Sequence, residues 1–508
     1  MLRLTLLPLD DRPVSRRLPV QLAQVAGATV ESPPPALLPR LRRAPDVTAL
    51  STWFAASRER ADASVVSLDA LGFGSLIASR TGTQRVDEVL ASWAPVARPG
   101  PPVHAAIVVP RTPDSADATE EPPYWDPHGP ALHRLSAELS DREPDLAGAR
   151  ARVAANVPAD VVADWVGRRL RQHALALAAL DLHRRDLLTT LVVGVDDAAE
   201  RSLSAAAQHD LARWVQVLGT GDRALVHPGA DETGAVLVAR AVLAASDAAP
   251  PRVVLRCAVA GGLDRVAPYE TGPVRHTAVR QLEAAGAVVV HAGPSDAGPS
   301  DAGSSDVDCH VVVHAPAVGP SRGDWAVTPP DVLDHEAAAA TARIVARLVS
   351  AGHRVAVADV AHPNGADPAL VAALAAVDAW PHLAGYAAWN TAGNTLGTVA
   401  AQVVVTTLAQ RAGTFDAAAH RRMLAHRVAE DAGWMSRVRA QVRAELGSDP
   451  SRHDVVHPTP DQRSAWEARL TSVLAATRGL EDLHVAPGSL ALPWDRTFEI
   501  DMDVEAAP

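Results

Sequence analysis

Lysine is absent from this chain of 508 residues, in which all 47 basic residues are arginine. That absence excludes a Schiff-base lysine, a pyridoxal-phosphate enzyme and a phosphate loop of the G-K-[ST] type. Cysteine is nearly absent too. Cys257 and Cys309 lie far apart in apolar runs, so we expect buried free thiols rather than a disulfide or a metal pair. No C-x-x-C pattern occurs, which argues against thiol redox chemistry.

Long uninterrupted apolar segments are also missing. No run of about 18 apolar residues is free of interruption, so we expect no transmembrane span. The first apolar run is broken by Pro8 and two acids, which makes it too short for a signal peptide, and we expect a cytoplasmic protein. A net charge of −12 without a basic patch argues against nucleic-acid and membrane partners. The expected partner is a small-molecule or oligosaccharide substrate, and the oligomeric state is left open.

Short β-branched runs alternate with longer Ala-, Leu- and Arg-rich helical segments over the first four-fifths of the chain. Strands that are apolar on both faces and separated by helices predict a parallel α/β sheet. We expect a TIM-like (β/α)-barrel over residues 1–405, with an open doubly wound sheet as the alternative. Residues 292–307 are a Gly-, Pro-, Ser- and Asp-rich repeat, for which we expect a disordered loop. Residues 406–508 are expected to form a helical C-terminal segment with a closing strand.

Polar side chains follow the carboxyl ends of seven predicted strands. These residues are Asp10, Asp69, Arg111, Asp196, Asp231, Asp359 and Asn390. Both barrels and doubly wound sheets place their functional sites at that edge of the strands, so we expect these residues to line one cleft. Helix N-capping by chance accounts for one or two of them, but not for all seven.

Several motifs, spread in order along nearly the whole chain, resemble those of the DUF4127 family of bacterial proteins. They are "LPLDDRPV" at 7–14, "VVSLDALGFGSLIASR" at 65–80, "EEPPYW" at 120–125, "VVGVDDA" at 192–198, "PGADE" at 228–232, "YE" at 269–270, "AWNTAGNTLGT" at 388–398 and "PWDRTFE" at 493–499. Ala388 replaces an expected glycine, and the repeat near residue 300 is an insertion. The resemblance implies a large α/β architecture and specifies no reaction, so the chemistry has to come from the residues.

The adjacent acids Asp196 and Asp197 are the most informative pair, and counting runs places them after the fourth strand. The pair resembles that of barrel glycosidases acting on N-acetylated sugars, such as hyaluronidases, O-GlcNAcases and β-hexosaminidases. This fold-level analogy implies a retaining, substrate-assisted reaction in which Asp196 orients the acetamido group and Asp197 is the general acid. A helix cap with a solvated neighbour is the plain structural interpretation. A metal-dependent hydrolase or lyase using the same carboxylates is the second functional one.

The remaining candidates are expected to bind the substrate. An acid beside an arginine can hold sugar hydroxyls, and a tryptophan beside amides is typical of a sugar pocket. The residues are Asp10, Asp11, Arg12, Asp69, Arg111, Asp231, Glu232, Asp359, Trp389, Asn390 and Asn394. A non-catalytic carbohydrate-binding protein, with Trp389 as the stacking platform, is the third alternative. No acid or histidine spacing matches a known metal signature, and we expect neither a metal nor a cofactor.

Overall fold

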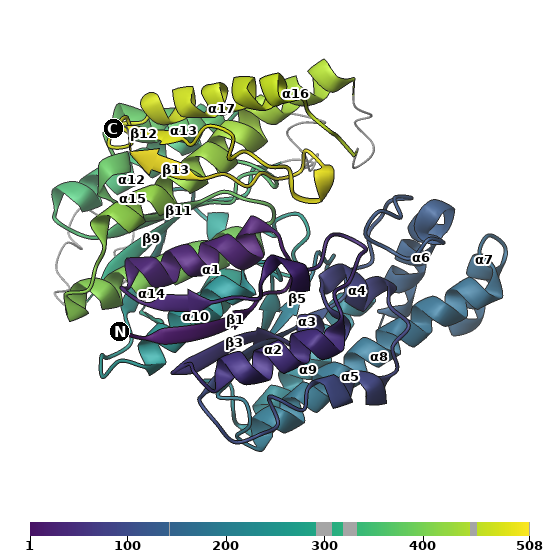
Figure 1. Cartoon of the computed structure of the whole chain (residues 1–508). Helices are drawn as coiled ribbons and strands as arrows, with labels where there is room; N and C mark the ends of the chain where they lie inside the picture. The colour runs from purple at the N-terminus through teal and green to yellow at the C-terminus, as the bar shows by residue number, and fades with distance from the viewer. Residues whose placement is uncertain (142, 291–306, 319–332, 448–454, 507–508) are drawn as a thin grey trace. The chain divides into compact units, whose positions relative to one another are not determined.

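A computed structural model describes residues 1–141, 143–290, 307–318, 333–447 and 455–506. The chain divides into two compact units. Unit 1 comprises Met1–Asp11, Thr29–Leu237 and Tyr269–Thr271, and unit 2 comprises Arg12–Ala28, Val238–Pro268 and Gly272–Pro508. Each unit is built around its own parallel sheet (Figure 1).

Unit 1 contains a six-stranded sheet in which every pairing is parallel. In sheet order its strands are β2 (Thr29–Glu31), β1 (Arg3–Leu7), β3 (Ala63–Ser67), β4 (Val103–Val109), β5 (Thr190–Val195) and β6 (Ala224–Pro228). The helices between them are α2 (Val47–Arg58), α3 (Leu68–Phe73), α4 (Leu76–Thr81), α5 (Val86–Ser92), α6 (Trp125–Leu139), α7 (Leu146–Ala154), α8 (Ala159–Arg184) and α9 (Leu203–Leu218), with a 3₁₀ turn, η1 (Pro35–Leu37).

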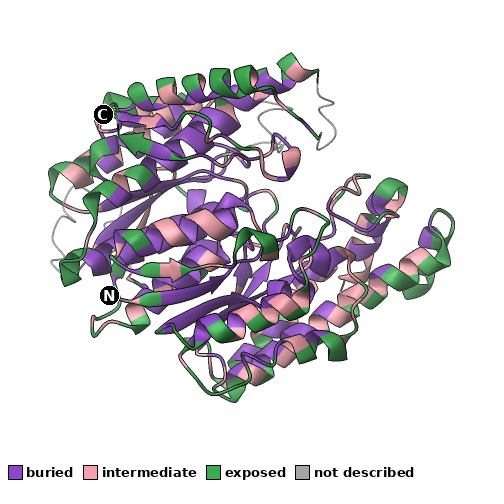
Figure 2. Cartoon of the chain, viewed as in Figure 1, coloured by how far each residue is buried: buried purple, intermediate pink, exposed green. Residues whose placement is uncertain are grey.

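The central strands of unit 1 form where β-branched and aliphatic residues run together, and β3, β4 and β5 are buried along their whole length. Phe54, Phe73 and Trp93 pack with Leu175 and Leu211 in the same apolar core. Figure 2 shows this buried sheet and the exposed residues on the helices that cover it. Because the strands are all parallel, the segments that follow their carboxyl ends share one edge of the sheet.

Unit 2 contains a five-stranded parallel sheet in the order β11 (Leu383–Ala387), β10 (Val355–Asp359), β9 (Cys309–His314), β7 (Arg252–Cys257) and β8 (Val288–Val289). Its helices are α1 (Pro13–Val25), α11 (Val274–Ala285), α12 (His335–Ser350), α13 (Pro368–Ala376), α14 (Ala392–Ala412), α15 (Ala417–Arg427), the π-helix η4 (Val428–Val438), α16 (Arg439–Leu446) and α17 (Pro460–Ala475). Helix α10 (Thr233–Ala244) crosses the division between the units. Three 3₁₀ turns, η2 (Gly262–Asp264), η3 (Trp380–His382) and η5 (Pro493–Asp495), and an antiparallel pair, β12 (Leu483–Val485) with β13 (Val504–Ala506), complete the unit.

The prediction of a parallel α/β architecture is confirmed, but a closed TIM-like barrel is not found among the described residues. The strands form two separate sheets, and the open doubly wound alternative fits these strand orders. Asp196 follows the fifth strand rather than the fourth, because the short, partly exposed strand β2 carries no apolar run. Residue 405, the expected domain boundary, lies within α14 of unit 2. The predicted disordered loop lies almost wholly outside the described residues.

The structure describes Cys257 and Cys309 as free thiols, with Cys309 buried and Cys257 half-buried. Within the described ranges, no helix combines the length and the apolar character that a membrane crossing needs.

Candidate functional site

The polar residues predicted at strand ends do follow the strands, and they fall into two groups. Asp10, Asp69, Arg111, Asp196 and Asp231 follow β1, β3, β4, β5 and β6 of unit 1. Asp359 is the last residue of β10, and Asn390 follows β11, both in unit 2. That all of them line one cleft stays a prediction, and each group is described within its own unit.

A close approach between β5 and the segment after β6 fixes the backbone just before the aspartate pair. A Cβ atom on Gly194 would lie 2.4 Å from the carbonyl oxygen of Gly229, so no larger residue fits there without movement. The backbone N–H of Asp196 donates to the Val109 carbonyl at 3.1 Å, which ties the end of β5 to the end of β4. The first aspartate therefore starts from a rigid position.

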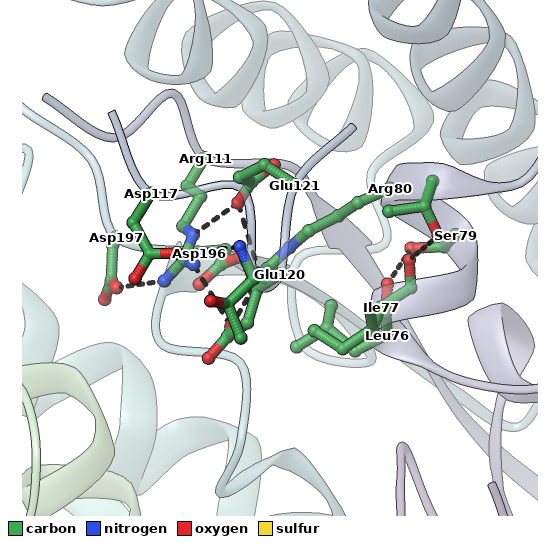
Figure 3. Close-up of polar contacts among 12 residues, drawn as sticks. Leu76, Ile77, Ser79, Arg80, Arg111, Asp117, Glu120, Glu121, Asp196 and Asp197 are labelled. Carbon is green, nitrogen blue, oxygen red and sulfur yellow. Dashed lines mark hydrogen bonds and ion pairs between the residues drawn. The ribbon is translucent and has the colours of Figure 1, made fainter. Parts of the chain in front are cut away.

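Arg80, on α4, is the centre of a buried ion-pair network (Figure 3). Its guanidinium contacts Asp196, and it lies 2.9 Å from Glu120 and 3.4 Å from Glu121. The Arg80 side chain is 3% exposed, and the Asp196 side chain is 8% exposed. A carboxylate buried against such a cation is held in one orientation.

Arg111, after β4, connects the second aspartate to the same network. Its guanidinium donates to Asp197 at 3.2 Å, to Glu120 at 3.1 Å and to Glu121 at 2.9 Å. Figure 3 shows these contacts converging on the arginine. We refer to the six residues Arg80, Arg111, Glu120, Glu121, Asp196 and Asp197 as the acid–guanidinium cluster. In it, four carboxylates face two guanidinium groups.

The two aspartates share a pattern of bonding but differ in exposure. Each has its Oδ2 atom on an arginine: Asp196 on Arg80, and Asp197 on Arg111. Among the described residues, neither Oδ1 atom accepts a hydrogen bond. The Asp197 side chain is 26% exposed, about three times as much as that of Asp196. Each carboxylate thus keeps one oxygen for a ligand, and Asp197 is the more accessible of the two.

Protonation also separates these groups. Burial and the charge of Asp196, with a contribution from Asp231, raise the pKa of Asp197 to about 6, although Arg111 opposes the shift. Burial likewise raises the pKa of Glu121, against the opposing charges of Arg80 and Arg111. A carboxyl group with a pKa near 6 exchanges its proton close to neutral pH, which suits a general acid or base.

The other predicted residues of unit 1 are buried near the strand ends. Asp69 accepts hydrogen bonds from the Val108 backbone N–H at 2.9 Å and from Gln172 at 3.1 Å. Burial raises the pKa of Asp69 to about 7. Asp10, Asp231 and Glu232 are also buried, and Asp11 is half-buried. Their part in substrate binding stays a prediction.

In unit 2, the strand ends carry a second polar group built around His314. Its Nε2 atom lies 3.1 Å from Asp367, and its Nδ1 atom lies 3.0 Å from the Thr341 hydroxyl. Thr341 donates its own proton to the Ala337 carbonyl at 2.9 Å, so His314 must donate from Nδ1. Although burial opposes it, the hydrogen bond to Asp367 raises the pKa of His314. His314 and Asp367 are therefore a buried, hydrogen-bonded ion pair.

Asp359 lies next to this pair, and both of its carboxylate oxygens accept hydrogen bonds from the backbone. It accepts from the N–H groups of Asp367 at 2.7 Å and Ala361 at 3.4 Å. Burial and the charge of Asp367 raise the pKa of Asp359 to about 7, against the opposing charge of His314. These bonds hold the segment that follows β10 in a fixed conformation.

The remaining predicted residues of unit 2 are buried or half-buried. The Trp389 ring is 2% exposed and packs edge-on against Phe498 at 6.0 Å, so its face is covered. Asn394 donates to Thr391 at 3.1 Å, and the Asn390 carbonyl accepts from the backbone of Asn364 at 2.7 Å. Arg12 lies 4.8 Å from the centre of the Trp494 ring. The stacking role of Trp389 stays a prediction, and it requires this ring to become uncovered.

Three members of the acid–guanidinium cluster were not predicted from the sequence as site residues: Arg80, Glu120 and Glu121. The two glutamates belong to "EEPPYW", a motif that marked the family resemblance without suggesting a role. Arg80 is the last residue of "VVSLDALGFGSLIASR", another motif of that resemblance, and the sequence alone does not distinguish it from a surface arginine. Only the fold brings these three side chains to the end of β5.

Among the described residues, no group of three or more histidine, cysteine or acidic side chains has an arrangement that could hold a metal ion. In the acid–guanidinium cluster, the donor oxygens already face two arginines, whose positive charge disfavours a bound cation.

Comparison with known proteins agrees with the motif resemblance. No curated protein and no solved structure matches the chain. The model of one family, described as "Protein of unknown function (DUF4127)", matches residues 4–503. This match spans both units and nearly the whole sequence, so the chain belongs to the DUF4127 family.

Proposed function

We propose that the protein is a retaining glycoside hydrolase that acts on an N-acetylated amino-sugar, with Asp196 and Asp197 as its working pair. The observation that carries the proposal is the division between these neighbours. Asp196 is buried against Arg80, whereas Asp197 is more exposed and has a pKa raised to about 6. Two carboxyl groups whose environments differ in this way can share out the anionic and the proton-transferring roles of one reaction.

In the proposed reaction, the acetamido oxygen of the substrate attacks the anomeric carbon while the bond to the leaving group breaks. Asp197 gives its proton to the departing glycosidic oxygen. Asp196 accepts a hydrogen bond from the acetamido N–H through its available Oδ1 atom. In the second half, water attacks the anomeric carbon, the cyclic intermediate opens, and Asp197 takes the proton from that water, so the first configuration is restored.

The rest of the acid–guanidinium cluster positions the pair. Arg80 holds Asp196 in one orientation, and Arg111 limits the rise in the pKa of Asp197. Glu120 and Glu121 bridge the two arginines, which fixes both guanidinium groups relative to each other. The sugar class rests on the adjacency of the two acids, because an acetamido group and a glycosidic oxygen occupy neighbouring ring positions.

The first test is a panel of aryl N-acetylglycosides and natural oligosaccharides, with the anomeric configuration of the first product followed by NMR. We expect hydrolysis with retention, and tight inhibition by a thiazoline mimic of the cyclised intermediate. Asp197→Asn should slow substrates with poor leaving groups by about 10²–10⁴-fold and activated aryl glycosides much less. Asp196→Asn should slow both kinds. Asp181→Asn, which removes an exposed carboxylate from the same unit, is the control.

Three results would overturn the proposal. Equal losses of activity for both leaving-group classes in Asp197→Asn would show that Asp197 is not the general acid. Activity that a chelator abolishes and a divalent cation restores would favour the metal-dependent alternative. Sugar binding by the wild type without turnover of any glycoside would favour a carbohydrate-binding protein.

A further inference from the structure

Unit 1 contains a cavity of about 360 Å³ that the acid–guanidinium cluster does not use. It lies between α8 and α9, beside the end of β4 and the end of α6, and the three helices are labelled in Figure 1. Its apolar walls include Leu139, Leu170, Leu203, Ala206 and Ala207. The polar lining residues are Arg169, Gln172, His173 and Asp210. The volume is within the range of small-molecule sites, at its lower end.

Arg169 is the distinctive residue of this cavity, because its charge has no carboxylate beside it. Its guanidinium donates to the Thr112 and Ser204 hydroxyls at 2.8 and 2.9 Å, and to the carbonyls of Arg111 and Pro110 at 3.3 Å each. All four acceptors are neutral. No aspartate or glutamate of the described chain lies within ion-pair distance of it. Its Nε atom makes no hydrogen bond to the described residues.

The other ionisable side chains around the cavity already have hydrogen-bonding partners. Asp210 lies 3.1 Å from His173, and Arg168, the neighbour of Arg169 on α8, lies 2.6 Å from Asp164. Burial lowers the pKa of Arg169 to about 10 against the more distant charge of Glu121, which still leaves the guanidinium charged at neutral pH. A half-buried cation without a counter-ion is costly, and an anionic ligand that enters from the cavity would supply one.

We propose that this cavity binds a small apolar molecule that carries one carboxylate, with the carboxylate on Arg169 and the hydrocarbon part against the leucines and alanines. A medium-chain or aryl-alkyl acid has this chemistry. The site is independent of the glycosidase proposal, because none of its lining residues is a member of the acid–guanidinium cluster. Its Arg169 does hold the backbone carbonyl of Arg111, so a ligand here would bind next to a residue of the cluster.

The test compares octanoate with octanamide, which has the same chain and shape but no charge, by ligand-observed NMR titration of the full-length protein. We expect octanoate to bind wild type about 10- to 100-fold more tightly than octanamide, the range for a charge-assisted contact. Arg169→Gln should abolish that preference. Arg171→Gln, which also removes a guanidinium without a carboxylate partner from α8 but does not line this cavity, should keep it.

A second variant separates binding from folding. Ala206→Phe fills the cavity without touching the hydrogen bonds of Arg169, so it should weaken octanoate and octanamide alike while the circular dichroism spectrum stays that of wild type. The proposal is overturned if octanoate does not bind, if the two ligands bind equally, if the preference survives Arg169→Gln, or if Ala206→Phe binds octanoate normally. None of these outcomes depends on glycoside turnover.

Discussion

The two parallel sheets both end in clusters of acidic and basic side chains, yet the clusters differ in what they leave available. At the end of β5, Asp196 and Asp197 each keep one oxygen without a partner among the described residues. At the ends of β9 and β10, His314 uses both ring nitrogens, and Asp359 uses both oxygens. The first arrangement can receive a ligand, and the second is satisfied by the protein itself. Position at a strand end therefore does not by itself identify a site.

We expect the largest effect when one acid is removed from the group formed by His314, Asp359 and Asp367, whose hydrogen bonds the protein itself supplies. Asp367→Ala leaves His314 buried without its counter-ion and removes the N-cap of α13. We expect the free energy of unfolding to fall by about 3–5 kcal/mol, the usual loss when one partner of a buried pair is removed. Urea denaturation measures it. Asp367→Asn, which keeps a capping side chain, should lose less. A loss below about 1 kcal/mol would show that this cluster is not structural.

A smaller loss in the free energy of unfolding, which depends on pH, is expected when the acid–guanidinium cluster is changed. Arg80→Gln keeps a hydrogen-bond donor but leaves Asp196, Glu120 and Glu121 without their shared cation. We expect a loss of about 2–3 kcal/mol at pH 8. The charge of Arg80 lowers the pKa of Glu121 against the effect of burial, so losing it raises the folded-state pKa of Glu121 further, and a raised pKa makes stability fall as pH rises. The loss should therefore shrink at pH 5, and an equal loss at both pH values would contradict this account.

The smallest effect is a displacement of the pH profile. The proposed reaction needs Asp197 protonated, so kcat/KM should decline as pH rises through its pKa of about 6. Arg111→Gln removes a cation that lowers this pKa, so the alkaline limb should move to higher pH. Arg184→Gln removes an exposed arginine and should leave the limb in place. An alkaline limb that moves to lower pH, or does not move, would show that Asp197 is not the group whose titration sets this limb.

Sequence patterns predicted the parallel α/β class because strands buried on both faces have a distinctive composition. They also predicted which strands end in polar residues. They could not distinguish a barrel from two open sheets, because closure depends on which strands become neighbours, as with β6 at one edge of its sheet. Nor could they predict the arginine partners. Arg80 is 116 residues from Asp196 in the chain, and only the fold brings them together.

The sequence also could not show whether Trp389 is a sugar platform or a core residue, because that depends on contacts made by the fold. A tryptophan beside two asparagines is typical of a sugar platform, but the identical sequence fits a core position. The difference lies in Phe498, more than a hundred residues away, which packs against the ring. The pairing of His314 with Asp367 could not be predicted from the sequence either, because His314 ends one strand and Asp367 follows another.

In the proposed reaction Asp196 and Asp197 have different roles, and burial together with the charge of Asp196 raises the pKa of Asp197. ¹³C NMR titration of the Asp197 carboxyl group, in wild type and in Asp196→Asn, tests this most directly. We expect a wild-type midpoint near 6 and a lower midpoint once the Asp196 charge is removed. A wild-type midpoint near the ordinary aspartate value of about 4 would contradict it, as would a midpoint that Asp196→Asn leaves unchanged.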